Sequence, residues 1–236
     1  MSNPVYLCPS PTGDVVVLDG PEGRHAATVK RTRVGEVVDL VDGRGTRVTG
    51  TVTAAAKDSI TVVVTSRTAE PAPSPRLTLV QALAKGDRGE LAVELATEVG
   101  VDAVLPWSAA RCVVRWDGDR GPKALERWRS TAREAAKQAR RAWFPEVGEP
   151  VTTAQVAALP GTVLVLHEAA SVPLTSVDLT GDLVLVVGPE GGLTDEELQV
   201  LTAAGATAVR LGETVLRTST AGAAALAVVS SRTGRW

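Results

Sequence analysis

The sequence contains few aromatic residues, few cysteines and few histidines. Five tryptophans, one tyrosine and one phenylalanine are present among 236 residues, so the hydrophobic core must consist mainly of valine, leucine and alanine. Cys8 and Cys112 lack the spacing of a metal site or a redox pair. His25 and His167 have no second histidine or cysteine near them in the sequence. We therefore expect two reduced thiols and no bound metal.

Long hydrophobic runs are also absent. No apolar stretch approaches the roughly 20 residues that a bilayer-spanning helix needs, so we expect no membrane association of that kind. Residues 1–20 contain three prolines and two aspartates but no basic segment ahead of an apolar stretch, and they do not resemble a secretory signal. Together with the unpaired cysteines, these features predict a cytoplasmic protein.

The composition is that of a globular protein with an uneven charge distribution. Hydrophobic residues make up 44% and charged residues 22% of the chain, and the length allows one large or two modest domains. The net charge is −2. Residues 111–141 nevertheless hold ten basic and four acidic side chains. A basic block on an acidic protein predicts a polyanionic partner.

Three alternate prolines divide the chain. Pro71, Pro73 and Pro75 predict an extended linker over residues 71–76. We expect a small β domain over residues 1–70, because short β-branched runs alternate there with glycine-containing and aspartate-containing turns. A short helix is expected over Gly23–Arg33. The predicted strands of this domain are Val15–Leu18, Val37–Val41, Arg47–Thr53 and Ile60–Thr65.

Strands alternate with helices over residues 77–236. This pattern predicts an α/β domain with a mostly parallel sheet covered by helices on both faces. The predicted strands are Leu77–Ala82, Ala103–Leu105, Val163–Leu166, Leu183–Val187 and Ala208–Leu211. The predicted helices are Arg88–Val99, Pro122–Trp143, Leu193–Ala204 and Ser219–Ser231.

A glycine-rich loop, Gly188-Pro-Glu-Gly-Gly192, follows the apolar run Leu183–Val187. Thr194 and Glu197 after it match a helix capping box. Capping does not explain the glycines, which at the end of a parallel strand let the backbone approach a ligand closely. Walker and dinucleotide-binding glycine patterns are absent, and the acids after the loop oppose a polyphosphate. A neutral or cationic adenine-containing ligand is favoured over a plain tight turn.

A second succession of strand, loop and helix begins at Leu211. One of the hydroxyl residues at positions 218–220 can cap the helix. The small residues Ala221–Ala225 allow another backbone to pack closely against it. A tightly packed core helix without a ligand is the alternative interpretation.

Together the two loops resemble a known family. Gly188-Pro-Glu-Gly-Gly192, followed by Leu211-Gly-(x)3-Leu-Arg-Thr-x-Thr-Ala221, is similar to the SPOUT methyltransferases. It most resembles the ribosomal RNA small-subunit methyltransferase E family, which methylates N3 of a uridine in 16S ribosomal RNA. The segments 85–101, 134–141 and 145–147 also match, and the family has a PUA-like domain where this chain has its small β domain.

The resemblance implies a C-terminal trefoil knot, S-adenosylmethionine as cofactor, a homodimer, and methylation of 16S rRNA in the small ribosomal subunit. It also implies a set of residues around the cofactor. These are Leu166, His167, Glu168, Val187, Gly188, Pro189, Glu190, Gly191, Gly192, Leu211, Gly212, Val215, Leu216, Arg217, Thr218, Thr220 and Ala221.

The basic block lies mainly on the predicted helix Pro122–Trp143. Apolar residues from Leu125 to Ala139 recur at steps of three and four and form one stripe, and basic residues occupy the remaining arc. Few acids balance them, so phosphate contact is favoured over a merely solvated face. Trp143 and Phe144 either stack on a base or pack in the core. The expected RNA-binding residues are Arg24, Lys30, Arg31, Arg33, Arg133, Lys137, Arg140 and Arg141.

Arg217 and Glu190 are the candidate catalytic residues. Methyl transfer needs aligned reacting atoms, and N3 of uridine must also lose a proton. Arg217 could stabilise the developing uracil anion, and Glu190 is the nearest base in sequence. Alternatively, Arg217 pairs with Glu190 or Glu213. A ribose 2′-O-methyltransferase of the same superfamily and a non-catalytic RNA-binding protein are the competing functions.

Overall fold

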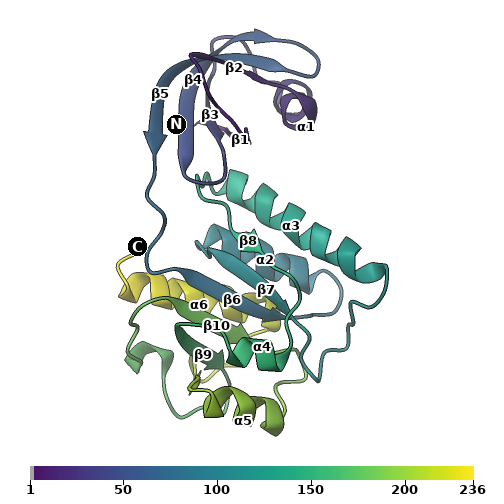
Figure 1. Ribbon diagram of the computed structural model, residues 1–236, viewed down its shortest axis with the longest axis vertical. Coiled ribbons are helices and arrows are strands. Elements are labelled where there is room, and N and C mark those ends of the chain that lie inside the picture. Colours follow the sequence, from purple (N-terminus) through teal and green to yellow (C-terminus); the bar gives the residue numbers. More distant parts are fainter. Residues whose placement is uncertain (1–2) are drawn as a thin grey trace. The chain divides into compact units, whose positions relative to one another are not determined.

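The structure, a computed structural model, describes residues 3–236, which form two compact units (Figure 1). Unit 1 contains the chain up to Ala72 together with Ala136–Phe144. Unit 2 contains Pro73–Ala135 and Pro145–Trp236. The change from unit 1 to unit 2 thus falls inside the proline-rich segment. Residues 136–144 group with unit 1 although they follow much of unit 2 in the sequence.

Unit 1 is a curled five-stranded sheet (Figure 1). Its strands are β1 (Val5–Leu7), β2 (Val15–Leu18), β3 (Val37–Val41), β4 (Thr46–Ala55) and β5 (Ile60–Ala69), in the spatial order β1-β3-β4-β5-β2. The β1–β3 pair is parallel and the other pairs are antiparallel. Tyr6, Leu40 and Ile60 are fully buried between the strands. The small β domain predicted from the turn signals is therefore present.

The helical segment of unit 1 begins earlier than predicted. α1 (Gly20–Arg24) has Pro21 in its first turn and continues as a π-helical turn over His25–Val29. Proline favours the start of a helix because its missing N–H would have no partner there. The segment ends before Arg31, whose φ of 55° is incompatible with a continuing helix. The prediction of a helix over Gly23–Arg33 was therefore wrong at both ends.

Unit 2 is built on a six-stranded parallel sheet. Its strands are β6 (Leu77–Ala82), β7 (Ala103–Trp107), β8 (Glu146–Val147), β9 (Thr162–Leu166), β10 (Leu183–Val187) and β11 (Thr207–Val209). They lie in the order β11-β9-β10-β6-β7-β8, and every neighbouring pair is parallel. β10 is buried along its whole length. The uninterrupted apolar runs correctly predicted strands covered on both faces.

Helices cover both faces of this sheet (Figure 1). α2 (Arg88–Glu98) and α6 (Thr218–Arg232) pack against each other and against β6. α4 (Thr153–Ala157) and α5 (Asp195–Ala203) pack together on the other side. A 3₁₀ turn spans Leu174–Ser176. In residues 3–236 no helix is both long and apolar enough to cross a membrane.

α3 (Arg120–Gln138) is shorter than predicted. Its residues Leu125, Trp128 and Ala132 are buried in the core of unit 2, so the predicted apolar stripe is confirmed there. The helix ends at Gln138 rather than Trp143, and Arg140 has a φ of 56°. The apolar stripe ends at Ala139, one position past the helix, so the periodicity did not support a helix as far as Trp143.

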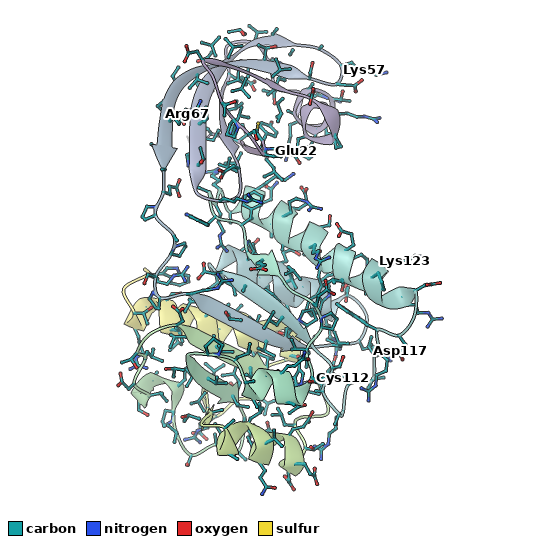
Figure 2. The ribbon with its side chains drawn as sticks, in the orientation of Figure 1. Glu22, Lys57, Arg67, Cys112, Asp117 and Lys123 are labelled. Carbon is teal, nitrogen blue, oxygen red and sulfur yellow. The ribbon has the colours of Figure 1, made fainter. Side chains whose placement is uncertain are left out.

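The two cysteines are free, as predicted, and both are buried. Cys112 lies beyond the carboxyl end of β7, in the segment that leads past Asp117 to α3, where Lys123 lies in the first turns (Figure 2). Burial raises the pKa of the Cys112 thiol, although hydrogen bonds partly oppose it. The thiol is therefore neutral at physiological pH and packs as an apolar side chain.

Candidate active site

A cavity of about 360 Å³ opens at the carboxyl ends of three neighbouring strands. Leu166, Val187 and Val209 end β9, β10 and β11 and line this cavity. Because the strands are parallel and adjacent, the loops that follow them meet at one edge of the sheet. The volume lies within the range of small-molecule sites in proteins.

The glycine-rich loop after β10 has a conformation that favours glycine at two positions. A β carbon on Gly188 would lie 2.4 Å from the side chain of Leu193. Gly192 has a φ of 71°, where glycine is favoured. The predicted capping box follows at once, since the Thr194 hydroxyl accepts from the backbone N–H of Glu197 at 3.1 Å. The loop therefore passes directly into α5.

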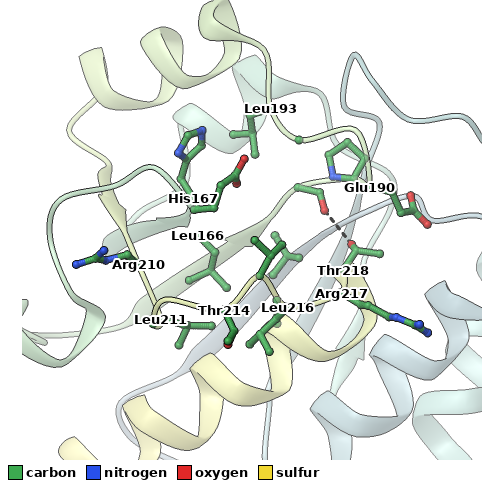
Figure 3. A pocket seen from close by; sticks show the side chains of 18 of the residues that line it. Leu166, His167, Glu190, Leu193, Arg210, Leu211, Thr214, Leu216, Arg217 and Thr218 are labelled. Atoms are coloured by element: carbon green, nitrogen blue, oxygen red, sulfur yellow. Dashed lines mark hydrogen bonds between the residues drawn. The ribbon is translucent and has the colours of Figure 1, made fainter.

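A buried hydrogen-bond chain joins the two loops that the sequence singled out. The Thr218 hydroxyl donates to the carbonyl oxygen of Gly188 at 2.8 Å (Figure 3). The side-chain amide of Gln81 donates to the same hydroxyl oxygen at 3.0 Å. Gln81 is fully buried at the end of β6. Gln81 was not among the predicted site residues, although a glutamine in an otherwise apolar strand is a detectable signal.

Three arginines line the cavity, and two of them are ion-paired. The guanidinium of Arg88 lies 3.2 Å from a carboxylate oxygen of Glu190. That of Arg210 lies 3.1 Å from Glu213. Within residues 3–236, the guanidinium of Arg217 makes neither a hydrogen bond nor an ion pair. The alternative pairing of Arg217 with Glu190 or Glu213 is thus wrong.

Glu190 is held in place from two directions. Its carboxylate accepts a hydrogen bond from the backbone N–H of Lys85 at 3.3 Å and from Arg88 at 3.2 Å. Partial burial raises the pKa of Glu190, but backbone hydrogen bonds and Arg88 outweigh that effect and leave the pKa below its usual value. Glu190 and Arg217 lie on the same flank of the cavity (Figure 3).

Most of the predicted cofactor residues lie together around this cavity. Those that line it are Leu166, His167, Glu168, Val187, Gly188, Pro189, Glu190, Gly192, Leu211, Gly212, Val215, Leu216, Arg217, Thr218 and Ala221. Gly191 and Thr220 belong to the same loops but are not among the lining residues. The lining residues that were not predicted as cofactor contacts are Arg88, Leu193, Val209, Arg210, Glu213 and Thr214.

The predicted RNA-binding residues have different environments. Arg24, Lys30, Arg31 and Arg33 are exposed on unit 1. Arg140 is also exposed. Arg133, in unit 2, is partly exposed and lies 3.5 Å from Glu126. Arg141 is half-buried.

Lys137 departs from the expectation for an RNA-binding residue. Its side chain is 4% exposed, and its ammonium lies 2.6 Å from the carboxylate of Glu22. A buried, ion-paired ammonium is not accessible to a phosphate. Phe144 belongs to an apolar cluster with Val5 and Val41, so of the two alternatives for this segment the structure supports core packing.

Comparisons with known proteins assign the chain to a family. A family model described as an RNA methyltransferase domain matches residues 70–230, and one described as an RNA methyltransferase PUA domain matches residues 18–65. The ribosomal RNA small subunit methyltransferase E of Mycobacterium bovis is 50% identical over 95% of this chain and 89% of that protein. The chain belongs to this family. Its Bacillus subtilis member is 30% identical over 92% of this chain and 90% of that protein.

Solved structures of the family have the same fold. Ribosomal RNA small subunit methyltransferase E from Neisseria gonorrhoeae, bound to S-adenosylmethionine, has a TM-score of 0.88 and 29% identity, with 98% of each chain covered. A Legionella pneumophila protein solved with bound SAM has a TM-score of 0.90 and 29% identity over 98% of each chain. The predicted α/β fold with an N-terminal PUA-like domain is confirmed.

Proposed function

We propose that the chain is an S-adenosylmethionine-dependent methyltransferase that methylates N3 of a uridine in 16S rRNA of the small ribosomal subunit. The observation that carries this proposal is the cavity at the carboxyl ends of β9, β10 and β11, which is lined by both family loops. Two solved proteins with the same fold hold S-adenosylmethionine. The family's rRNA methyltransferases supply the substrate class.

The residues around the cavity fit S-adenosylmethionine. Leu166, Val187 and Leu211 offer apolar surface for an adenine ring. A β carbon on Gly212 would meet nothing within 4 Å, so the backbone there is open to a ligand. Carboxylates such as Glu168 favour a cation. We propose that the predicted cofactor residues bind the molecule through these backbone groups and apolar surfaces. When bound, it supplies a methyl group on a positively charged sulfur.

We propose Arg217 as the catalytic residue. A uridine that loses its N3 proton becomes an anion shared with two carbonyl oxygens, and a fixed cation nearby stabilises that charge. The other two arginines of the cavity are paired with carboxylates, whereas the guanidinium of Arg217 has all its donors available among the described residues. Arg217 is therefore the cation best suited to the anionic base.

Glu190 is a second candidate for the chemistry. Its carboxylate could accept the N3 proton, but a lowered pKa makes it a weak base. Its two donors, Lys85 and Arg88, also hold the carboxylate against the start of α2. We therefore assign the stabilisation of the anion to Arg217 and give Glu190 the smaller part in proton transfer.

Unit 1 is proposed to bind RNA. Support comes from the match of residues 18–65 to an RNA methyltransferase PUA domain and from exposed basic residues on this unit. Such residues contact phosphates, and structured RNA is recognised largely through shape and phosphates. The proposed contacts on unit 1 are Arg24, Lys30, Arg31, Arg33, Arg140 and Arg141, and Arg133 is the proposed contact on unit 2.

We also propose a homodimer, a C-terminal trefoil knot and a cytoplasmic location. The family resemblance supports the first two, and rRNA as substrate supports the third. Sedimentation at micromolar concentration tests the oligomeric state. A monomer at that concentration would contradict the proposed homodimer.

Nucleoside mass spectrometry tests the proposed reaction. Small ribosomal subunits and naked 16S rRNA from a strain without this activity are incubated with the protein and deuteromethyl S-adenosylmethionine. We expect labelled N3-methyluridine. A ribose-methylated nucleoside would contradict the proposal and favour 2′-O-methylation. Cofactor and RNA binding without label transfer would favour a non-catalytic RNA-binding protein.

A further inference from the structure

The segment between β7 and α3 carries an arginine that contacts the glycine-rich loop from outside the cavity. Arg111 directly precedes Cys112 in the sequence, and Cys112 lies beyond the end of β7 (Figure 2). Its Nη1 atom donates to the carbonyl oxygen of Gly191 at 3.1 Å and to that of Leu193 at 2.9 Å. One guanidinium nitrogen therefore holds two carbonyl groups of the loop that borders the cavity.

The backbone at Arg111 is itself fixed to the helix that follows the loop. The N–H of Ala110 donates to one carboxylate oxygen of Glu197 at 2.8 Å. The other oxygen of Glu197 accepts from the N–H of Thr194 at 3.1 Å. Glu197 is 6% exposed. Loop, α5 and the Arg111 segment thus form a closed ring of bonds through one buried carboxylate.

The glycine-rich loop needs such external contacts to be ordered. It has three glycines in five residues, and glycine loses more conformational entropy on ordering than any other residue. Its carbonyl groups are held by side chains from elsewhere, Gly188 by Thr218 and Gly191 by Arg111. A β carbon on Gly191 would lie 3.2 Å from that of Arg111. The two segments are therefore in direct contact.

We propose that Arg111 is a positioning residue that orders the glycine-rich loop before the cofactor binds. The proposal rests on the proposed function. A preordered loop lowers the cost of binding. Bound cofactor orders the loop in any case, so loss of Arg111 should raise the KM for S-adenosylmethionine and change kcat little. Because Arg111 is exposed and belongs to the basic block, an RNA phosphate contact is the competing role.

The test compares Arg111→Met with Arg120→Met. Both substitutions remove one exposed charge from the same part of the chain, and the Arg120 side chain makes no hydrogen bond or ion pair among the described residues. Calorimetry with S-adenosylmethionine in the absence of RNA should show about tenfold weaker binding for Arg111→Met and a change below twofold for Arg120→Met. Arg111→Lys, which keeps a donor, should recover part of the affinity. At saturating cofactor, kcat should stay within about threefold.

Hydrogen exchange of the amides at 188–194, measured without ligand, gives a readout independent of the cofactor. We expect faster exchange in Arg111→Met at an unchanged Tm. The proposal is overturned if the two Met variants exchange at equal rates, or if Arg111→Met leaves the affinity for S-adenosylmethionine unchanged. It is also overturned if Arg111→Met lowers only the affinity for RNA. If the parent protein does not bind S-adenosylmethionine, the proposed function fails, and the exchange rates still decide whether Arg111 orders the loop. Should Arg111→Met not fold, the Lys variant takes its place in both measurements.

Discussion

Arg217 and Lys137 show how the surroundings of a basic side chain decide what it can do. Both belong to segments that the sequence marked as functional. Arg217 is exposed beside the cavity, and its guanidinium has no partner in the described part of the chain. Lys137 is buried against Glu22. The first is available to a substrate, whereas the second contributes to the stability of unit 1.

Replacement of Arg217 by alanine should slow the chemical step. The lost cation would no longer stabilise the uracil anion, so we expect kcat to fall by about 100-fold or more. The affinity for S-adenosylmethionine should change by less than about threefold. Arg217→Lys, which keeps the charge, is the control and should retain part of the rate. Single-turnover kinetics measures the rate of methyl transfer, and calorimetry measures the affinity for S-adenosylmethionine. An equal loss of rate and of affinity would assign Arg217 to cofactor binding.

Replacement of Lys137 by methionine should destabilise the protein. It removes one partner of a mostly buried ion pair and leaves the carboxylate of Glu22 without this cation, at a cost on the order of 3 kcal/mol. Urea unfolding monitored on unit 1 measures the change. Arg140→Met, at an exposed position of the same segment, is the matched control. If Lys137→Met lowered the RNA affinity and left the free energy of unfolding unchanged, Lys137 would belong to the RNA-binding surface.

At the level of helices and strands, four strands were predicted with their exact bounds. Leu183–Val187 is an uninterrupted apolar run, and Leu77–Ala82 is mostly apolar although it contains Thr78 and Gln81. Val15–Leu18 and Val37–Val41 are the other two. β1 was not predicted, since it has only three residues and lies between prolines. α4 was also missed, although Thr152 and Gln155 form a capping box that marks its start.

The site residues that belong to short, continuous sequence motifs were predictable. The two loops are short motifs, and their resemblance to one family predicted that both border the same site. In the structure, a hydrogen bond joins Thr218 of one loop to Gly188 of the other. Gln81, Arg88 and Arg111 were not selected. Their partners lie about 80 to 140 positions away. Gln81 is conspicuous as a polar residue in its strand, but no pattern along the chain indicates which distant residue each of the three contacts.

The contacts of the glycine-rich loop should respond to acid. The folded pKa of Glu190 is lowered, so its ionised form stabilises the fold above the unfolded pKa of about 4.3. That contribution is lost as the pH falls from there through the lower folded value. NMR titration of the Glu190 carboxylate should give a midpoint below about 4.3, and Arg88→Met should move it upward. A midpoint at or above 4.3 would contradict the observed contacts.

At the scale of the whole molecule, charge is distributed unevenly along the chain and over its surface. The chain is acidic overall, yet basic side chains gather in residues 111–141 and on the exposed surface of unit 1. An acidic protein that binds RNA must rely on such local concentrations of positive charge. Its RNA affinity should therefore depend on which basic residues are changed, not only on how many.

Reversal of two exposed charges on unit 1 should lower the salt dependence of RNA binding. Arg31→Glu with Arg33→Glu removes two proposed phosphate contacts. The negative slope of log K against log salt should become shallower by about 1.4 to 1.8. Lys57→Glu with Lys123→Glu changes the net charge equally at other exposed positions and should leave the slope nearly unchanged. Equal slopes for the two double variants would show that residues 31 and 33 do not contact phosphate.

Unit 1 is not continuous in the sequence, and this has a consequence for its synthesis. Ala142 and Phe144 complete the apolar cluster around Val5 and Val41, and the indole N–H of Trp143 donates to the carbonyl oxygen of Glu70 at 3.0 Å. A nascent chain on the ribosome cannot complete this cluster until residue 144 has emerged. By then β6 and β7 of unit 2 have already been made. The two units must therefore mature in an interleaved order, and a fragment that stops at residue 72 would expose the cluster to water.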